Sequence, residues 1–294
     1  MASSGSLRIL RRRIKSVKNT QQITRAMEMI AASRIQRAQR RVEEALPYAE
    51  MITEIMRGLA VAAEVRDHPL LAPHDTVRTV GICVVSSDRG LAGAYNANIL
   101  RHAERLIRIE RERGADVSIF AVGRKAESYF RFRGQPITAA WTGFSERPDI
   151  GDAMEIAQTL MDAYSGEELD RVWLVFTDFR SSIVQVPGHL QILPVEREEL
   201  AGGERLPGEF MYEPNPDDIL TFLIPRYVEA KVFAGLLESA ASEQAMRQRA
   251  MKAASENAEE VVEGLSRELN AARQAQITQE IAEIVGGAEA LSGV

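Results

Sequence analysis

The last third of the chain, residues 217–291, has a spacing of apolar and small side chains that constrains the fold more than any other feature. From Tyr227 these side chains recur in alternating steps of three and four residues, which is the signature of a left-handed coiled coil. The positions are Tyr227, Ala230, Ala234, Leu237, Ala241, Gln244, Gln248, Met251, Ser255, Ala258, Val262, Leu265, Leu269 and Ala272. A continuous helix of this stretch is roughly 110 Å long. A globular domain of this size cannot bury such a rod, so we expect it to lie against a partner helix, other subunits, or both.

A second long helix is predicted at the start of the chain, over roughly residues 6–65. Its clearest alternation of steps begins at Ile35 and continues to Ala63, and Pro47 interrupts it. A proline inside a helix removes one backbone hydrogen bond, so we expect a local bend there. Ordinary amphipathic helices of a bundle would show similar stripes, but helices longer than about 25 residues are more typical of coiled coils.

The two ends of the chain carry opposite charge. Residues 1–41 contain eleven Lys and Arg and one acid, a net charge of +10, whereas residues 255–294 contain eight Glu and two Arg, a net charge of −6. Opposite charges attract when they are brought side by side. An antiparallel pairing of the two long helices would bring the basic start of the first beside the acidic end of the second. The middle of the chain would then be inserted at the turn between the two helices.

The middle of the chain changes period and predicts a small α/β domain. Buried strands are expected near 77–86, 117–122 and 172–177, a further β segment at 183–195, and helices at 95–113, 123–132 and 150–164. Strands that alternate with helices imply a mostly parallel, Rossmann-like sheet. We therefore expect a helical segment over 1–66, a proline-containing linker over 67–76, the α/β domain over 77–208 and a second helical segment over 209–294.

Signatures of catalysis are not found in the sequence. Neither a phosphate-binding glycine motif nor a nucleophile or zinc-protease motif occurs, and we expect no catalytic residue, no cofactor and no metal. The single cysteine, Cys83, lies in an apolar run and is expected to be buried. The four histidines are scattered, and we expect each to be structural or exposed to solvent.

Two segments leave other functions open. The turn from Ser87 to Asn96 joins a strand to a helix N-terminus and could hold an anion, although its glycines are better explained by a tight turn. The basic run from Arg11 to Lys15 could contact phosphates of a nucleic acid. Nucleic-acid sites of this kind usually add aromatic side chains for stacking, and none occurs between Met1 and Pro47.

Neither a membrane span nor an export signal is expected. No run of 18 apolar residues occurs, and the basic N-terminus lacks the apolar core of a secretory signal. The basic N-terminal residues fall inside an unbroken helix pattern, so we expect them to belong to the mature protein.

Several stretches resemble the gamma subunit of rotary F-type ATP synthases, in its bacterial form. Residues 14–33, IKSVKNTQQITRAMEMIAAS, resemble its N-terminal signature, and residues 86–93 with Asn96 resemble its first strand and turn. The matches in the C-terminal helix are residues 226–230, 241–247, 250–254 with Asn257, and 272–288, ARQAQITQEIAEIVGGA. The resemblance spans the chain, with specific motifs at both ends and a looser middle.

This resemblance implies a shaft that performs no bond chemistry. The coiled coil would stand inside a hexamer of alpha and beta subunits, with the α/β domain at the foot, against the epsilon subunit and the membrane ring of c subunits. Rotation of the ring by proton flow would then drive the catalytic beta subunits through binding, synthesis and release of ATP. The implied location is the cytoplasmic side of the cell inner membrane, where the chain is held by its partners, and binding of nucleic acid is not implied.

The matching motifs also imply contact residues. Met27 and Arg247 correspond to positions facing an acidic mobile segment of the beta subunit, and the foot that meets the c ring corresponds to Phe210, Met211 and Tyr212. Upper contacts with the catalytic subunits correspond to Arg273, Gln274, Thr278, Glu280 and Glu283. On pattern alone these polar residues would be solvated helix surface. The run Met246 to Arg249 is more basic than the usual form, and 261–269 follows no motif of the family, which leaves partner-specific contacts open.

Three hypotheses therefore differ in what they predict. A rotary shaft should lack ATPase activity when isolated and should assemble with alpha and beta subunits. A coiled-coil nucleic-acid adaptor should bind RNA or DNA through its basic N-terminus in a salt-dependent manner. An α/β enzyme with a helical arm should bind a phosphate or nucleotide at residues 88–93.

Overall fold

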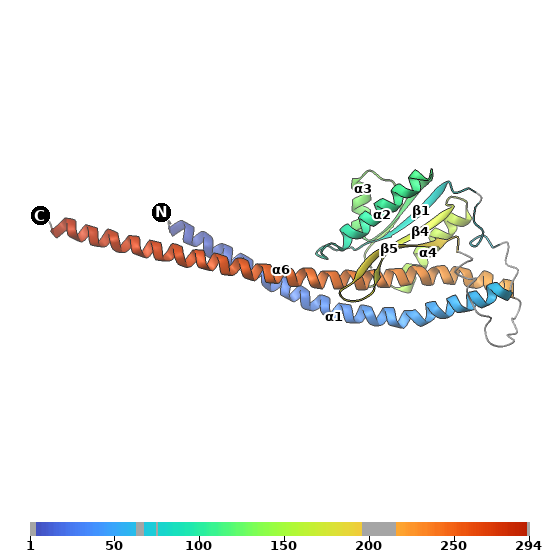
Figure 1. Cartoon of the computed structure of the whole chain (residues 1–294), viewed down its shortest axis with the longest axis horizontal. Coiled ribbons are helices and arrows are strands. Elements are labelled where there is room, and N and C mark those ends of the chain that lie inside the picture. The colour runs from blue at the N-terminus through green and yellow to red at the C-terminus, as the bar shows by residue number, and fades with distance from the viewer. Residues whose placement is uncertain (1–3, 63–67, 75, 196–215, 293–294) are drawn as a thin grey trace. The chain divides into compact units, whose positions relative to one another are not determined.

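The computed structural model describes residues 4–62, 68–74, 76–195 and 216–292, and it divides into two compact units. Unit 1 contains the start of the first long helix and the end of the last, residues 1–30 and 248–294. Unit 2 is the segment from Ala31 to Arg247. The long helices are α1 (Ser4–Ala62) and α6 (Pro216–Ser292), which confirms that both ends of the chain are helical rods (Figure 1).

In unit 1 the two helices pair through small and polar side chains. The Thr24 and Ser255 hydroxyls are hydrogen bonded at 2.7 Å, and Thr24 and Ser255 are both buried. Leu7, Met251 and Ala258 are buried as well. The beginning of α1 thus packs on the later part of α6, as an antiparallel pair requires. From residue 277 to 288 every side chain of α6 is exposed, so the paired region ends near Ala272, where the alternating spacing also ends.

Unit 2 contains a five-stranded sheet in the order β3-β2-β1-β4-β5. Its strands are β1 (Thr79–Val85), β2 (Asp116–Val122), β3 (Ile137–Trp141), β4 (Arg171–Phe179) and β5 (Gln185–Leu193). All neighbouring strands are parallel except β4 and β5, which are antiparallel. The expected mostly parallel sheet is confirmed. Strand β3 was not expected from the sequence.

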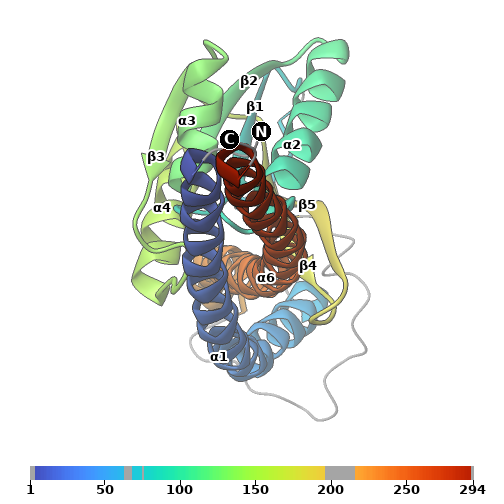
Figure 2. The ribbon, with the colours of Figure 1, turned by 90° about the vertical axis from the view of Figure 1, so that its left-hand side faces the viewer.

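The helices of unit 2 cover both faces of this sheet (Figures 1 and 2). One face packs on α2 (Tyr95–Glu112) and α3 (Arg124–Phe132), and the other on α4 (Ile150–Ser165) and on the parts of α1 and α6 that belong to this unit. The side chains of β1 alternate between the two faces of the sheet. Val80, Ile82 and Val84 pack in a first core, on the side of α2 and α3, whereas Cys83 and Val85 pack in a second core, on the side of α4 and the long helices.

The long helices contribute large side chains to that second core. Ile52 and Met56 of α1 and Tyr227 and Val232 of α6 are each at most 5% exposed, and they join the cluster that contains Leu174 of β4. The sheet is therefore built onto the helix pair by an apolar layer. Burial of apolar surface contributes about 25 cal/mol per Å², so this layer attracts the sheet domain to the helices.

Candidate functional site: the junction between the sheet and the long helices

The turn that follows β1 is closed by its own side chains. Ser87 donates its N–H to Asn96 Oδ1 at 3.1 Å, and its hydroxyl donates to the carbonyl of Arg89 at 2.5 Å. Gly93 has a φ of 56°, which favours glycine. These contacts agree with the interpretation of the turn as a structural element that starts α2.

Asp88 of this turn is held by backbone amides of two other segments of the sheet domain. Its carboxylate accepts the backbone N–H groups of Arg124 at 3.1 Å, Gly143 at 2.8 Å and Ser145 at 3.0 Å. Burial alone would raise the pKa of Asp88, but the hydrogen bonds outweigh it and the pKa lies below its ordinary value. The Asp88 carboxylate thus ties the turn to the start of α3 and to the loop that follows β3.

Helix α6 covers the region where sheets of this topology bind ligands. In open α/β sheets that region is the crevice at the carboxyl ends of the strands where the order reverses, here between β1 and β4. Thr177, near the end of β4, donates its N–H to Ser239 Oγ and accepts from Ser242 Oγ, both at 3.2 Å. Tyr95, at the start of α2, is 1% exposed and contacts the same group of side chains. Side chains of a helix therefore fill a region that an enzyme of this fold would keep for its ligand.

A cluster of charged groups lies beside this covered crevice. Arg247 of α6 donates through Nη2 to Glu243 Oε1 at 2.5 Å and to the carbonyl of Gly90 at 3.3 Å. Its Nη1 lies 3.7 Å from Oε1 of Glu146, on the loop between β3 and α4. Glu146 Oε2 also pairs with Arg34 of α1 and lies 3.6 Å from Nη1 of Arg89. The cluster thus joins two loops of the sheet domain to both long helices.

Burial strongly affects the acid at the centre of this cluster. The Glu243 side chain is 1% exposed, and its burial raises its pKa to about 7, although Arg247 and Ser145 act in the opposite direction. Glu146, which is also nearby, raises the pKa further. Glu243 is therefore a buried acid whose pKa is raised by burial and opposed by its pairing with Arg247, where α6 meets the sheet domain.

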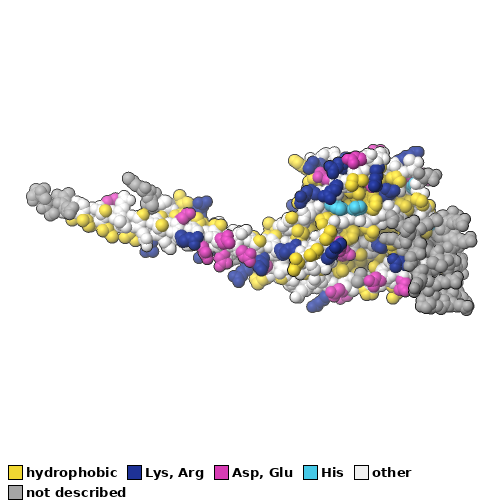
Figure 3. Space-filling model, in the orientation of Figure 1, with side chains coloured by type: hydrophobic (Ala, Val, Ile, Leu, Met, Phe, Trp, Pro, Cys, Tyr) yellow, Lys and Arg dark blue, Asp and Glu magenta, His cyan; other side chains and the backbone are white. Residues whose placement is uncertain are grey.

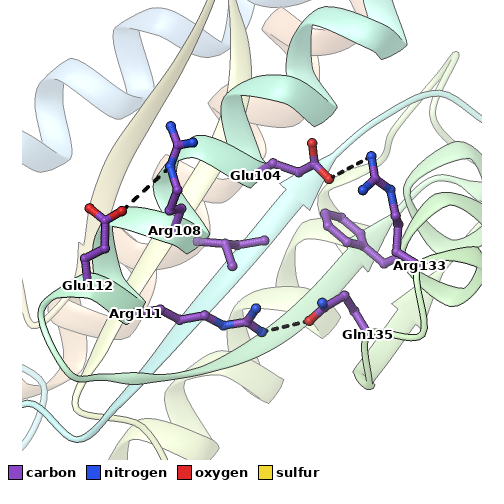
Figure 4. Close-up of a pocket in the computed structure, with 8 residues that line it drawn as sticks. Glu104, Arg108, Arg111, Glu112, Arg133 and Gln135 are labelled. Carbon is purple, nitrogen blue, oxygen red and sulfur yellow. Dashed lines mark hydrogen bonds and ion pairs between the residues drawn. The ribbon is translucent and has the colours of Figure 1, made fainter.

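The outer face of the sheet domain carries a charged groove between α2 and α3, with a volume of about 540 Å³ (Figure 4). Its charged rim is paired internally, because Arg133 contacts Glu104 at 3.4 Å and Arg108 contacts Glu112 at 4.0 Å. Arg111 donates to Gln135 at 2.7 Å. Since these groups satisfy one another, the groove offers less to a charged ligand than its arginines suggest.

The histidines take the structural and exposed roles expected for them. His74 pairs with Asp170 at 2.7 Å, and His102 Nε2 lies 2.9 Å from His189 Nδ1. Burial lowers the pKa of both His102 and His189, which favours the neutral forms that such a pair needs. Within the described residues, no three His, Cys, Asp or Glu side chains are grouped as a metal site would require.

The predicted contact residues that the structure describes belong to both units. Met27 is half-buried in unit 1, while Arg247 is 5% exposed in unit 2 and paired within the chain. The upper set is exposed on the last turns of α6, where Figure 3 shows apolar side chains on the surface too: Arg273, Gln274, Thr278, Glu280 and Glu283. Phe210, Met211 and Tyr212 lie outside the described residues.

Sequence reasoning missed Glu146 and the role of Asp88. Glu146 belongs to the stretch Phe144-Ser145-Glu146-Arg147-Pro148, which matches no motif and has no periodicity. Its partners Arg34 and Arg247 are 112 and 101 positions away in the chain. The only signal was a bulky, charged loop just before the capping box that starts α4 at Asp149.

Comparison with known proteins identifies the family to which this chain belongs. The family model described as ATP synthase matches residues 6–291. A protein named ATP synthase gamma chain from Acidothermus cellulolyticus is 49% identical over 292 residues, covering 97% of both chains. Another of that name from Saccharopolyspora erythraea is 47% identical over 301 residues, again covering 97% of both. The chain belongs to the family of ATP synthase gamma chains.

The gamma subunit is the non-catalytic rotor shaft of the F-type ATP synthase, and the covered crevice of the sheet domain agrees with that role. A solved structure of the Tetrahymena thermophila mitochondrial enzyme, titled as its central stalk and c-ring, is 26% identical, with a TM-score of 0.59 over 79% of this chain and 99% of that one. A Euglena gracilis mitochondrial structure, 16% identical, has a TM-score of 0.67 over 99% of this chain and 96% of that one, which shows the shared fold.

Proposed function

We propose that this gamma subunit couples the rotation of a c-subunit ring to the conformational cycle of catalytic beta subunits in an alpha–beta hexamer. The observation that carries the proposal is the pair of long helices fixed to a sheet domain whose ligand crevice is filled by one of them. A shaft acts by contacting different conformers of its partners with different affinity, so it needs rigid surfaces rather than a catalytic site.

The family and the names of similar structures support the proposed partners. The Tetrahymena structure includes a central stalk with a c-ring, which supports a c-ring as partner of this chain. The alpha and beta subunits, the epsilon subunit and a peripheral position on the cytoplasmic side of the inner membrane complete the proposal. Among the described helices, none combines the length and apolarity that crossing a membrane demands.

We extend the proposal to individual contacts. The exposed residues of the last turns of α6, from Arg273 to Glu283, would meet the catalytic subunits, and 210–212 would meet the ring. Met27 and Arg247 would face an acidic segment of the beta subunit. Since Arg247 is paired with Glu243 and Glu146, an acidic partner would have to replace one of these two carboxylates. The division of the chain into segments 1–66, 67–76, 77–208 and 209–294 remains a prediction.

The test is assembly. We expect the isolated chain to hydrolyse no ATP, and we expect it to co-purify with alpha and beta subunits as a complex that hydrolyses ATP. Measurable hydrolysis by the isolated chain, or failure to join the hexamer, would contradict the proposal. The nucleic-acid adaptor, which the comparisons do not support, predicts instead a salt-dependent shift with RNA or DNA.

A further inference from the structure

One carboxylate of the sheet domain is shared by arginines from both long helices and from a neighbouring loop. Glu146 pairs with Arg34 of α1 through Oε2 and faces Arg247 of α6 across 3.7 Å through Oε1. The side chain of Glu146 is 21% exposed and that of Arg247 6%. Solvent screens the Glu146–Arg247 pair less than it would at the surface, whereas Arg34 is 36% exposed and its pair is screened more. Loss of Glu146 would leave the buried Arg247 without one of its two carboxylates.

The loop that carries Glu146 is attached on both sides. Towards the sheet, Asp88 accepts the N–H groups of Gly143 and Ser145, and its own N–H donates to Ser145 Oγ at 2.8 Å. Towards the helices, the carbonyl of Pro148 accepts from Arg41 of α1 at 2.5 Å, two helical turns beyond Arg34. A continuous series of polar contacts therefore leads from the end of β1 to both α1 and α6.

Glu146 also balances a concentration of positive charge. A cavity of about 460 Å³ between the loop and the helices is lined by four arginines, and Glu146 is the one acid among its lining residues: Arg34, Arg37, Ala38, Arg41, Glu146, Arg147, Leu237 and Ala240. Like charges at this spacing on a helix repel one another. Neutralising Glu146 should therefore loosen the approach of the loop to α1, beyond the loss of one ion pair.

The apolar layer and the polar series resist different movements. Apolar packing is non-directional, so it holds the sheet domain against the helices but opposes rotation of the helices against the sheet only through the fit of side chains. Ion pairs and hydrogen bonds depend on distance and angle, so they fix one rotational setting. From this contrast we propose that Glu146 is a positioning residue. It sets the rotational register of the sheet domain on both long helices, and it increases the torsional stiffness of the connection between the sheet domain and these helices. The inference rests on the proposed function as a rotor.

The test uses the complete ATP synthase complex assembled with this chain. The substitution Glu168→Cys, at an exposed position, attaches a bead to the sheet domain while the hexamer is fixed. Burial raises the pKa of the Cys83 thiol to about 12, so the native cysteine does not compete for the label. The angular variance of the bead at rest measures torsional stiffness, and the ratio of protons pumped to ATP hydrolysed measures coupling.

We expect Glu146→Gln to raise the angular variance about twofold and to lower the coupling ratio against a high opposing proton gradient, with hydrolysis itself unchanged. Glu146→Asp, which keeps the charge, should restore most of the stiffness. Arg34→Gln should reproduce part of the effect, because it breaks one of the contacts of Glu146 and leaves that with Arg247. The double variant should be no worse than Glu146→Gln alone, since that substitution already breaks the contact with Arg34. The matched control is Glu112→Gln, which removes an exposed carboxylate of α2 and should leave both measurements unchanged.

Unchanged angular variance in an assembled Glu146→Gln complex would overturn the inference, as would additive effects of the two substitutions. A loss of coupling that only follows a loss of assembled complex would overturn it too, because it would show a general defect of folding. Failure of the unsubstituted chain to assemble or to couple would instead contradict the proposed function.

Discussion

At the scale of single residues, Gly123 shows how closely the sheet domain is built at the carboxyl end of its strands. Its φ is 89°, and an added Cβ would lie 2.3 Å from the carbonyl oxygen of Ser86. That carbonyl belongs to a backbone fixed by the bond from Ser86 N–H to Val122 O at 2.8 Å. The loop cannot move away without breaking the ladder between β1 and β2.

We therefore expect Gly123→Ala to destabilise the chain by about 3 kcal/mol, through both the strained φ and the clash. Urea unfolding followed by far-UV circular dichroism measures this change. Gly151→Ala is the control, because Gly151 lies in α4 and an added Cβ there would meet no atom within 4 Å. A loss at Gly123 no larger than that of the control would contradict the reasoning.

The pH dependence of stability is also decided by single residues. Burial, reinforced by Asp178, raises the pKa of Glu238 to about 7, although the N–H of Phe179 opposes the shift. The folded chain thus keeps the Glu238 carboxyl protonated at pH values at which the unfolded chain has already released the proton. Stability is lost as pH rises from the unfolded pKa, about 4.5, to about 7, and it stays lost above that.

Glu238→Gln should consequently stabilise the chain by roughly 2 kcal/mol at pH 8 and change little near pH 4.5. The measurement is the urea midpoint of the variant and of the parent chain at both pH values. Part of the pH dependence should remain in the variant, since Glu243 titrates in the same range. An equal stabilisation at both pH values would show that the group does not titrate as argued.

The role of a single residue could be predicted from the sequence only where its hydrogen-bond partners lie close to it along the chain. The closed turn from Ser87 to Asn96 agrees with its interpretation from the sequence, because the bonds that Ser87 makes to Arg89 and Asn96 span at most nine positions. The role of Asp88 could not be predicted, since its partners Gly143 and Ser145 are 55 and 57 positions away. No periodicity or motif reports a contact that exists only after the sheet has formed.

At the scale of elements, the hydrophobic period predicted nearly everything except β3. Strands β1 and β2 are continuous apolar runs because parallel strands are buried on both faces. Strand β3 has five residues and pairs only with β2 at the edge of the sheet, and its partly buried side chains alternate with exposed ones. A sequence of Ile, Thr, Ala, Ala and Trp does not display that alternation, because its exposed positions are small rather than charged.

The packing of α6 on β4 depends on a glycine that the sequence did not single out. An added Cβ at Gly235 would lie 2.7 Å from Cδ2 of Leu174 and 3.5 Å from Cγ of Phe176. Leu174 is fully buried, so it has little room to withdraw. The absence of a side chain lets the helix approach the strand closely enough for Ser239 and Ser242 to reach Thr177.

Gly235→Val should accordingly destabilise unit 2 by about 2 kcal/mol, through overpacking that displaces α6 from β4. Gly264→Val is the matched control: Gly264 also lies inside α6, but an added Cβ there would meet no atom within 4 Å. Thermal unfolding of the two variants compares the effects, and equal shifts in Tm would show that helix propensity, rather than packing, dominates at both positions.

At the scale of the whole molecule, the proposed function depends on contacts that the long helices make with other subunits. Met27 offers a direct test, because it is half-buried on α1 and we propose that it faces an acidic segment of the beta subunit. Met27→Lys adds a charge that would attract that segment, so we expect ATP synthesis to fall about tenfold while assembly is retained. Gln22→Lys adds the same charge at an exposed position of the same helix and serves as the control. Unchanged proton-pumping efficiency in the Met27 variant would refute the assigned contact.

The last turns of α6 separate folding from function most clearly. Ile277, Ile281 and Ile284 are 44%, 56% and 71% exposed, so they contribute little to the stability of the chain itself. Exposed apolar side chains in a row are typical of a surface that meets other proteins.

A chain ending at Leu269 keeps unit 2 complete and loses a segment that is exposed along most of its length. We therefore expect this chain to remain soluble, with the circular dichroism of its sheet domain unchanged, and to reach less than about half the coupled ATP synthesis of the full chain in reconstituted vesicles. Insolubility of the shortened chain would contradict the antiparallel pairing of the helices, whereas full coupling would show that the upper contacts carry no torque.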